Sequence, residues 1–284
     1  MSDLSYVQSV VLGVVEGLTE FLPVSSTGHL TITEKLLGLQ VNAPEVTAYT
    51  AIIQLGAIAA TLVYFFRDIV RLAVAWGRGL GNAEARTHHD YSLAWAVIVG
   101  SIPVAVVGFA LKKVIEGPLR SLWVVAAALI LWSAVMWLAE SRHAKIAREG
   151  GERGEGTVTV RDGLIIGLVQ CFSLIPGISR SGATISAGLF RGIDRVTATR
   201  LSFFLAIPAL TAAGLYEAAT TDLSNLGTGQ MGVGIVVAFG VAYASIAWLL
   251  RFVASNTLKP FVIYRVALGL VLVVSLATGL VTAT

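Results

Sequence analysis

Charged residues are scarce in this chain of 284 residues, since only 13% are charged and 56% are hydrophobic. A soluble domain of this length carries about a quarter charged residues, so the composition excludes an ordinary soluble enzyme and favours an integral membrane protein. Cysteine is nearly absent as well, and the single Cys171 excludes an internal disulfide and a thiolate-rich metal site. The net charge of +3 does not indicate a nucleic-acid partner, because excess lysine and arginine in a membrane protein marks cytoplasmic loops.

Two widespread functional motifs are missing from the sequence. There is no G-x-x-x-x-G-K-[ST] phosphate loop, which argues against work driven by ATP. There is also no H-E-x-x-H motif and no cluster of histidine and cysteine that would indicate zinc. Function must therefore be sought in the few polar residues that interrupt the apolar segments.

The apolar segments are of two kinds. A helix that crosses the membrane needs about 20 apolar residues, and six uncharged stretches reach or approach this length: 46–66, 91–111, 121–139, 201–216, 231–250 and 266–284. Two other apolar regions are broken by proline and polar residues, one into 4–15 and 28–39, the other into 163–175 and 182–190. Each piece is too short to cross, so we predict two re-entrant helical hairpins, whose irregular backbone is tolerated where protein or a cavity covers it.

The two broken regions also match each other in sequence. Four pairs of residues are each 154 positions apart: Gly13 and Gly167, Glu16 and Gln170, Ser25 and Ser179, and Gly28 and Gly182. Three spans follow each hairpin, and an odd number of crossings reverses the orientation of the second unit, which predicts an inverted-topology repeat with the hairpin turns meeting near the midplane. The predicted organisation is one all-α membrane domain over 1–284, with a first repeat at 1–140, a cytoplasmic linker at 141–160 and a second, inverted repeat at 161–284.

Basic residues favour one orientation of these segments. With both termini outside, fifteen basic residues face the cytoplasm and four face the outside, which is the bias expected of a multi-pass membrane protein. The fifteen are Arg67, Arg71, Arg78, Arg86, Arg142, Lys145, Arg148, Arg153, Arg161, Arg191, Arg195, Arg200, Arg251, Lys259 and Arg265. The four outside are Lys35, Lys112, Lys113 and Arg120. The one basic residue left over is Arg180, within the second broken region.

The first broken region contains the stretch "EFLPVSSTGH" at 20–29, preceded by Glu16. Glu16 and Glu20 are four residues apart and share one face of a helix. A charge at the centre of a membrane costs about 2.5–3.5 kcal/mol even on insertion scales, so we expect compensation by Arg180, by a bound cation or by protonation of one carboxyl. The alternative is a hydrated helix face at the membrane surface.

Ser26 and His29 in the same stretch are three residues apart, the spacing of a serine nucleophile and its base on a helical turn. The alternative is that Ser25, Ser26 and Thr27 cap the second short helix, and both readings can hold together. Three further histidines are expected to lie solvated in basic loops: His88, His89 and His143.

The second broken region contains "IPGISRSGAT" at 175–184, with Arg180 at its centre. A guanidinium offers five donors in a planar fork that suits phosphate oxygens, and the free N–H groups at a helix start also favour an anion. Neighbouring hydroxyls could contribute to the same site: Ser179, Ser181 and Thr184. The alternative is that Arg180 only neutralises a glutamate. Gln54, in the first span, could contact the site or make a helix–helix hydrogen bond.

Together these residues predict a midplane cavity for an anionic ligand with an apolar tail. At this point the segments "EGLTEFLPVSSTGHL" and "PGISRSGATI" resemble the two signatures of the bacitracin-resistance family of undecaprenyl-diphosphatases. The stretches "IIQLGAIAA" and "FFLAIP" resemble that family too, and the order of elements agrees over essentially the whole chain.

The resemblance implies a multi-pass enzyme of the bacterial plasma (inner) membrane. It would hydrolyse the phosphoric anhydride of undecaprenyl diphosphate, releasing phosphate and returning the carrier lipid to peptidoglycan synthesis. It would confer resistance to bacitracin, which competes for the same lipid, and it would depend on a divalent cation, Mg²⁺ or Ca²⁺. The resemblance leaves the number of subunits open, a homodimer included.

The family's functional residues map onto the two clusters. The resemblance assigns catalysis to Glu20, Ser26, His29 and Arg180. The family's dependence on a divalent cation makes Glu16 and Glu20 the candidates to hold the metal. On the residues themselves, we expect substrate binding by Glu16, Ser25, Thr27, Gln54, Ser179, Ser181 and Thr184. One departure is Arg200, which stands just before "FFLAIP" where many relatives carry an acidic residue.

Two questions remain open on the sequence. Ser26 could attack the terminal phosphorus with His29 or Glu20 as its base, or an activated water could attack directly. The same architecture is also that of secondary transporters, so a polyprenyl-phosphate flippase or an anion transporter is the alternative function.

Overall fold

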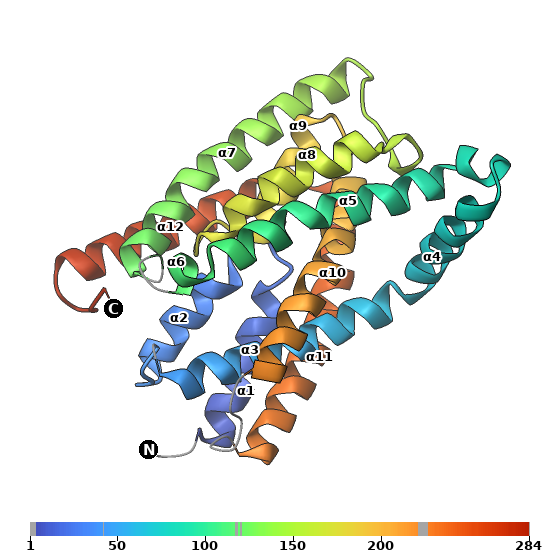
Figure 1. Cartoon of the computed structure of the whole chain (residues 1–284). Helices are drawn as coiled ribbons and strands as arrows, with labels where there is room; N and C mark the ends of the chain where they lie inside the picture. Colours follow the sequence, from blue (N-terminus) through green and yellow to red (C-terminus); the bar gives the residue numbers. More distant parts are fainter. Residues whose placement is uncertain (1–3, 42, 117–118, 120, 221–226, 284) are drawn as a thin grey trace.

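The computed structural model describes residues 4–41, 43–116, 119, 121–220 and 227–283, and within these ranges every element longer than an isolated bridge is helical (Figure 1). Arg120 and the side chain of Lys113, both placed outside on the sequence, are not among the described residues and side chains. The helices are α1 (Tyr6–Thr19), α2 (Ser26–Leu36), α3 (Pro44–Tyr64), α4 (Phe66–Gly81), η1 (Glu84–Thr87), α5 (His89–Ala110), α6 (Lys112–Glu116), α7 (Leu122–Arg148), η3 (Glu155–Thr157), α8 (Val160–Gln170), η4 (Cys171–Leu174), α9 (Arg180–Phe190), α10 (Arg195–Thr220), α11 (Thr228–Ser255) and α12 (Lys259–Ala277).

Five of these helices are long and apolar enough to cross a membrane: α3, α5, α7, α11 and α12. They cover most of five of the six predicted spans, which confirms an all-α protein with several membrane crossings. The sixth predicted span, 201–216, lies within α10, a helix of 26 residues that is not one of the five. Helix α7 continues to Arg148, so residues 141–148 of the expected linker are helical.

The broken regions form two short-helix pairs whose first helices pack tightly on spans. α1 packs on α11, and α8 packs on α5. At both contacts a glycine lets the backbones approach: a Cβ on Gly13 would lie 2.8 Å from the carbonyl oxygen of Gly234, and one on Gly167 would collide with the carbonyl of Gly100. Such small-residue contacts are typical of helix pairs in membranes, so the glycines fix where each hairpin sits.

Each hairpin turns at a serine with the same unusual backbone. Ser25 has φ 78° and Ser179 has φ 76°, the only non-glycine residues with positive φ in the described chain. Both are N-caps, whose hydroxyls accept from the backbone N–H of Gly28 at 3.4 Å and of Gly182 at 3.2 Å. The capping role considered for Ser25 is therefore confirmed. Such a backbone costs about 1–3 kcal/mol and is found mostly at functional sites.

Two groups of residues expected in loops lie elsewhere. His143 is fully buried on α7, 3.2 Å from Glu152, so the expectation of a solvated histidine was wrong there. Arg265, counted among the cytoplasmic residues, lies inside α12 and is also fully buried. The bias then rests on fourteen residues rather than fifteen. Both misplacements come from helices that start or end several residues beyond the uncharged stretch.

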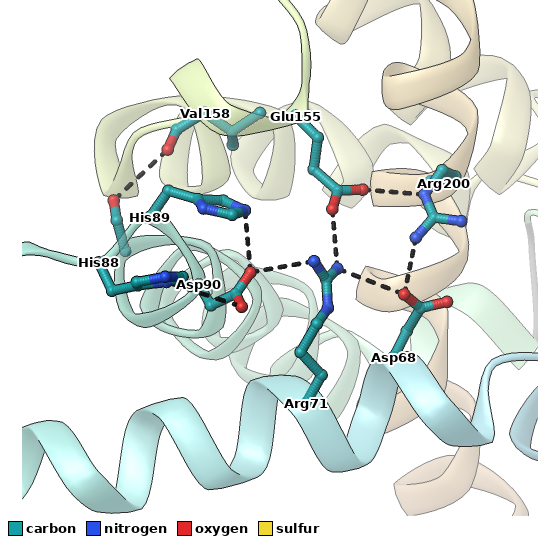
Figure 2. A network of polar contacts seen from close by, with 9 residues as sticks. Asp68, Arg71, His88, His89, Asp90, Glu155, Val158 and Arg200 are labelled. Atoms are coloured by element: carbon teal, nitrogen blue, oxygen red, sulfur yellow. Dashed lines mark hydrogen bonds and ion pairs between the residues drawn. The ribbon is translucent and has the colours of Figure 1, made fainter. Parts of the chain in front are cut away.

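Five charged residues form a network at one end of the molecule, which we call the Asp68–Arg200 network (Figure 2). Arg71 of α4 contacts Asp68 at 3.3 Å, Asp90 at 3.1 Å and Glu155 at 2.7 Å. Arg200 of α10 contacts both Glu155 and Asp68 at 2.9 Å. The network therefore ties α4, the start of α5, η3 and α10 together, and it accounts for Arg200 by contacts with residues outside both hairpin turns.

The arginines also set the charge state of Glu155 in this network. Burial alone would raise the pKa of Glu155, but hydrogen bonds from Arg71 and Arg200 outweigh it and hold that pKa below its ordinary value. His89 points its Nε2 at Asp90 from 2.9 Å, so this histidine joins the network and is not simply solvated. With His88 these two make the one group of three potential metal ligands within the described residues, at the start of α5.

Candidate active site

The two hairpin turns meet at the bottom of a cavity of about 540 Å³, which we call the hairpin cavity. Its walls are apolar and come largely from α5 and α10, with Val104, Phe109 and Leu210 among them. Seven of the residues predicted for the site line it: Glu20, Ser25, Ser26, Thr27, Gln54, Ser179 and Arg180. The structure thus joins clusters that lie about half the chain apart, with an apolar slot above them.

Glu20 is the centre of the polar floor. Its side chain is 5% exposed, and its two oxygens have different partners. Oε2 accepts from the Ser26 hydroxyl at 2.6 Å, and Oε1 accepts from Nη2 of Arg180 at 2.8 Å. A carboxylate that receives the serine proton and is held by an arginine is arranged to act as the base for that serine.

Arg180 is the first residue of α9 and its side chain is 10% exposed. Besides Glu20, it donates from Nη1 to the carbonyl of Ser202 at 3.2 Å, and its guanidinium carbon lies 5.8 Å from the ring centre of Phe21. Its Nε has no hydrogen-bond partner in the described chain. The pairing of Arg180 with a glutamate is therefore confirmed for Glu20, and the phosphate-binding role of the same side chain stays a prediction.

Ser181 and Thr184 do not line the hairpin cavity, although both were expected to bind substrate. Ser181 donates to the carbonyl of Leu22 at 3.0 Å, which ties the second hairpin to the first turn. Thr184 donates to the hydroxyl of Ser202 at 2.7 Å and so ties α9 to α10. The two hydroxyls therefore stabilise the arrangement of the hairpins and do not face the ligand, because each is already bonded to another group of the protein.

His29 points away from Ser26, contrary to the expected shared face. Its Nδ1 lies 2.7 Å from the carbonyl oxygen of Ser25 and its Nε2 lies 2.6 Å from the hydroxyl of Tyr264 on α12, with the two rings stacked. A carbonyl only accepts, so Nδ1 carries the proton and Nε2 accepts from Tyr264. Three residues along a helix bring two side chains to one side, but the contact of α2 with α12 turns the imidazole out of the cavity.

Glu16 and Gln170, paired by the repeat, are both buried and short of partners. Glu16 is 1% exposed and does not line the cavity, and its Oε1 has no hydrogen-bond partner within the described chain. Gln170 is fully buried and lines the cavity, yet neither its amide oxygen nor its nitrogen has a partner there. Buried polar groups are normally satisfied, so both residues are suited to a ligand. In the sequence, Gln170 marked only the repeat and gave no sign of a place in the site.

The oxygens around the cavity floor suit a hard divalent cation. Carboxylate and amide oxygens are the ligands that Mg²⁺ and Ca²⁺ prefer, and Glu16 and Gln170 each offer one that nothing else uses. Glu20 is already shared between Ser26 and Arg180. The residues therefore fit the expected cation, and of the two predicted carboxylates Glu16, which does not itself line the cavity, is the one with an oxygen that has no partner in the described chain.

Two further charged residues near the cavity escaped the sequence analysis as site residues. Lys112 lines the cavity, and its ammonium lies 4.4 Å from the ring centre of Tyr216, which also lines it. Arg265 lies beneath the floor and contacts both turns. Their positions in the chain gave no sign of this, because one follows a span and the other was assigned to a loop.

Comparison with known proteins agrees with this geometry. The sequence profile of the family described as "Bacitracin resistance protein BacA" matches residues 9–271. The chain is 55% identical to "Undecaprenyl-diphosphatase 1" of Frankia alni, over all of both chains. It is 54% identical to "Undecaprenyl-diphosphatase 1" of Streptomyces avermitilis and 52% identical to "Undecaprenyl-diphosphatase" of Cutibacterium acnes, in each case over 99% of this chain and all of the relative.

Proposed function

The chain belongs to the bacitracin resistance protein BacA family, and from this membership and the site geometry we propose that it hydrolyses undecaprenyl diphosphate to undecaprenyl phosphate and inorganic phosphate. One observation carries the proposal. Glu20 holds the Ser26 hydroxyl at 2.6 Å and Arg180 at 2.8 Å on the floor of an apolar cavity. A lipid diphosphate needs these three features together: an activated nucleophile, a cation for phosphate oxygens and an apolar slot for the tail.

The placement in the membrane completes the proposal. α10 is the sixth span, and the pairs α1–α2 and α8–α9 are re-entrant hairpins of an inverted repeat. The end with the Asp68–Arg200 network faces the cytoplasm, because most of the fourteen basic residues lie in the segments near it. Both termini then lie outside the plasma membrane of a bacterium. The apolar walls from α5 and α10 receive the polyprenyl tail from the lipid.

In the first step, Ser26 Oγ attacks the terminal phosphorus while Glu20 Oε2 takes the hydroxyl proton. The new Oγ–P bond forms as the bond from that phosphorus to the bridging oxygen breaks, and undecaprenyl phosphate leaves. Arg180 leaves part of its contact with Glu20 to bind phosphate oxygens as negative charge develops, aided by the start of helix α9. The proton that Glu20 took passes to the departing undecaprenyl phosphate, so Glu20 is again a base. In the second step, the oxygen of a water attacks the phosphorus while Glu20 takes the proton of that water. The Oγ–P bond breaks, Glu20 gives the proton to Ser26 Oγ, and inorganic phosphate leaves. Direct attack by water, with the same base, is the rival mechanism.

A divalent cation belongs to the proposed site. Glu16 and Glu20 would hold it, with the amide oxygen of Gln170 as a further donor. When bound, it would offset the charge of the diphosphate. Glu16→Gln should therefore raise the cation concentration required for half-maximal activity and leave the fold intact, as checked by thermal unfolding. Unchanged cation dependence in a folded Glu16→Gln variant would remove Glu16 from the ligand set.

Bacitracin enters the proposal through the substrate. A peptide that binds undecaprenyl diphosphate competes with this enzyme for the same lipid, so a faster hydrolysis leaves less of the target. Overproduction of the chain should raise bacitracin resistance, and overproduction of Glu20→Gln should not. The two forms must reach the same level in the membrane for the comparison to count.

The deciding experiment is phosphate release from undecaprenyl diphosphate by the detergent-purified protein, with and without chelator. We expect release that depends on a divalent cation and that falls by about 10²–10³-fold in Arg180→Ala, as when a charge-stabilising donor is removed. Arg251→Ala, at an exposed arginine of α11, is the matched control and should keep native activity. A folded native protein without release would favour the flippase or transporter, and lipid flipping in vesicles would then test that alternative.

A further inference from the structure

Arg265 is a fully buried cation with no carboxylate partner. It is the largest of the fully buried side chains in the described chain, and no acidic group among the described residues lies within ion-pair distance of it. A charge in such a position is costly unless hydrogen bonds satisfy it. A span that only had to cross the membrane would carry an apolar residue here, so the arginine calls for a role.

Neutral acceptors from three different segments surround its guanidinium. Nη2 donates to the carbonyl of Gly177 at 2.9 Å, and Nη1 is 3.4 Å from the carbonyl of Pro23. Nε donates to the Ser133 hydroxyl at 3.2 Å, and a longer contact of 3.5 Å reaches the carbonyl of Ala128. The first two carbonyls belong to the two hairpin turns, and the last two groups belong to α7.

The second turn is fitted closely to this arrangement. Gly177 has φ 101°, and a Cβ there would lie only 2.5 Å from the carbonyl oxygen of Val125 on α7. The turn therefore rests directly on α7, and its carbonyl is presented to Arg265. Next to Pro23 in the first turn, the carbonyl of Leu22 accepts from the Ser181 hydroxyl, so the two hairpins are also bonded directly to each other there.

Other roles for Arg265 do not fit these contacts. It does not line the hairpin cavity, so it does not touch the substrate in this arrangement. It is not exposed, so it does not anchor a lipid headgroup. It pairs with neither glutamate of the site, so it is not their counterion in the described chain.

We propose that Arg265 is a positioning residue that clamps the two hairpin turns to α7, so that Glu20 and Ser26 of the first hairpin meet Arg180 of the second. This inference rests on the proposed phosphatase function for its effect on catalysis, but not for the clamp itself. Each turn is made of backbone that no regular helix holds, and one planar donor fork is able to hold two such carbonyls at fixed separation. Loss of the fork would let the serine and the arginine drift apart by a fraction of a bond length or more.

The test uses Arg265→Lys, which keeps the charge but loses the fork. We expect its kcat to fall by about 10- to 100-fold, as for a small misplacement of reacting groups, with KM nearly unchanged. Hydrogen–deuterium exchange should become faster in the peptides covering 20–26 and 174–180 together, by roughly tenfold or more for a lost charge-assisted bond. Exchange in α3 and α11 should stay native.

Two serines give a matched control. Ser133 and Ser245 are both buried and both bond to their own helix, at 2.6 Å to Leu129 and 2.8 Å to Val241, but only Ser133 accepts from Arg265. Ser133→Ala should therefore lower kcat, but by a factor several times smaller than Arg265→Lys does. Ser245→Ala should leave kcat unchanged.

Three outcomes would overturn the clamp: native kcat in Arg265→Lys, a uniform rise in exchange over the whole chain, or a rise in only one turn. An inactive native protein would contradict the phosphatase proposal alone, because the exchange measurement still decides whether Arg265 holds both turns. If Arg265→Lys fails to fold, Ser133→Ala is compared with Ser245→Ala instead. The same exchange rates at the two turns in both variants as in the native protein would then overturn the clamp.

Discussion

The Asp68–Arg200 network and the hairpin site are both built from carboxylates and arginines, but their charges are matched differently. In the network every carboxylate and guanidinium has at least one ion-pair partner, and the arginines are a quarter to a third exposed. In the hairpin site Glu20 pairs with Arg180, while Glu16 and Arg265 have no ion pair in the described chain. Every charge of the network is thus paired, although Nε of Arg71 has no hydrogen-bond partner in the described chain, whereas the site leaves two whole charged groups without an ion pair.

The difference is informative because the unsatisfied groups are the buried ones. An unpartnered polar atom in an apolar environment costs about 1–3 kcal/mol, whereas water can satisfy a partly exposed one. Glu16 and Gln170 bear that cost in full. Such a cost is expected at a site where a bound ligand or cation supplies the missing partners. The hairpin site, and not the network, is therefore the candidate for catalysis.

The largest effect should come from one matched pair of substitutions. Glu20→Gln removes the base and the partner of Arg180, and we expect phosphate release to fall by about 10²–10⁴-fold. Glu155→Gln makes the same chemical change at a glutamate that also accepts from arginines, and it should leave activity close to native. Measuring both in the release assay tests the contrast directly. A comparable loss in Glu155→Gln would mean that the network also serves catalysis.

A smaller difference should separate two residues of the same helix. Ser26→Ala removes the hydroxyl that Glu20 accepts from, and a covalent mechanism predicts a loss of about 10²-fold or more. His29→Gln changes a side chain that lies on Tyr264 outside the cavity, and we expect a loss of about tenfold or less from a slight shift of α2. Detection of phosphoserine at Ser26 would support the covalent step. Near-native release by Ser26→Ala would leave water as the nucleophile, and a greater loss for His29→Gln would contradict the role given to Glu20.

The smallest effect concerns the stability of the network. The pKa of Glu155 is lower in the folded protein than its ordinary value of about 4.3. The ionised side chain therefore stabilises the fold fully above that pH, and the contribution is lost as the pH falls further through the lowered value. Glu155→Gln should unfold at a temperature roughly 2–4 °C lower at pH 7, for about 1 kcal/mol, and the two proteins should converge on acidification. Glu84→Gln, at an exposed glutamate, is the control, and an equal gap at every pH would contradict the ion-pair account.

Much of the architecture could be predicted because a segment inside a membrane must be apolar, and this can be read from a short stretch of sequence. Composition alone indicated a membrane protein, and five of the predicted apolar stretches lie in helices suited to crossing it. The two polar clusters were found for the same reason, since polar residues are conspicuous in apolar surroundings. The matching of Ser25 with Ser179 by position also had a structural counterpart, because both adopt the same strained backbone.

The directions of individual side chains could not be predicted in this way. Helical spacing placed Ser26 and His29 on one side, but the neighbouring α12 supplies Tyr264 and turns the imidazole toward it. Arg265 was assigned to a loop because it stands just before the uncharged stretch 266–284, whereas α12 begins at Lys259 and takes it into the core. In both cases the deciding contact is made by a helix far away in the sequence.

By itself, then, the sequence determined that the chain lies in a membrane, where its apolar segments run and which reactive side chains are available. Each of these depends on the character of a short stretch of chain. The tertiary structure decided which groups meet. Glu20 and Arg180 are 160 residues apart, and Arg265 and Pro23 are 242 apart. Whether such groups touch depends on how closely helices pack, and that is set by glycine contacts and turn geometry distributed over the whole chain, so the pairing of base, nucleophile and arginine emerges only when the two hairpins are brought together.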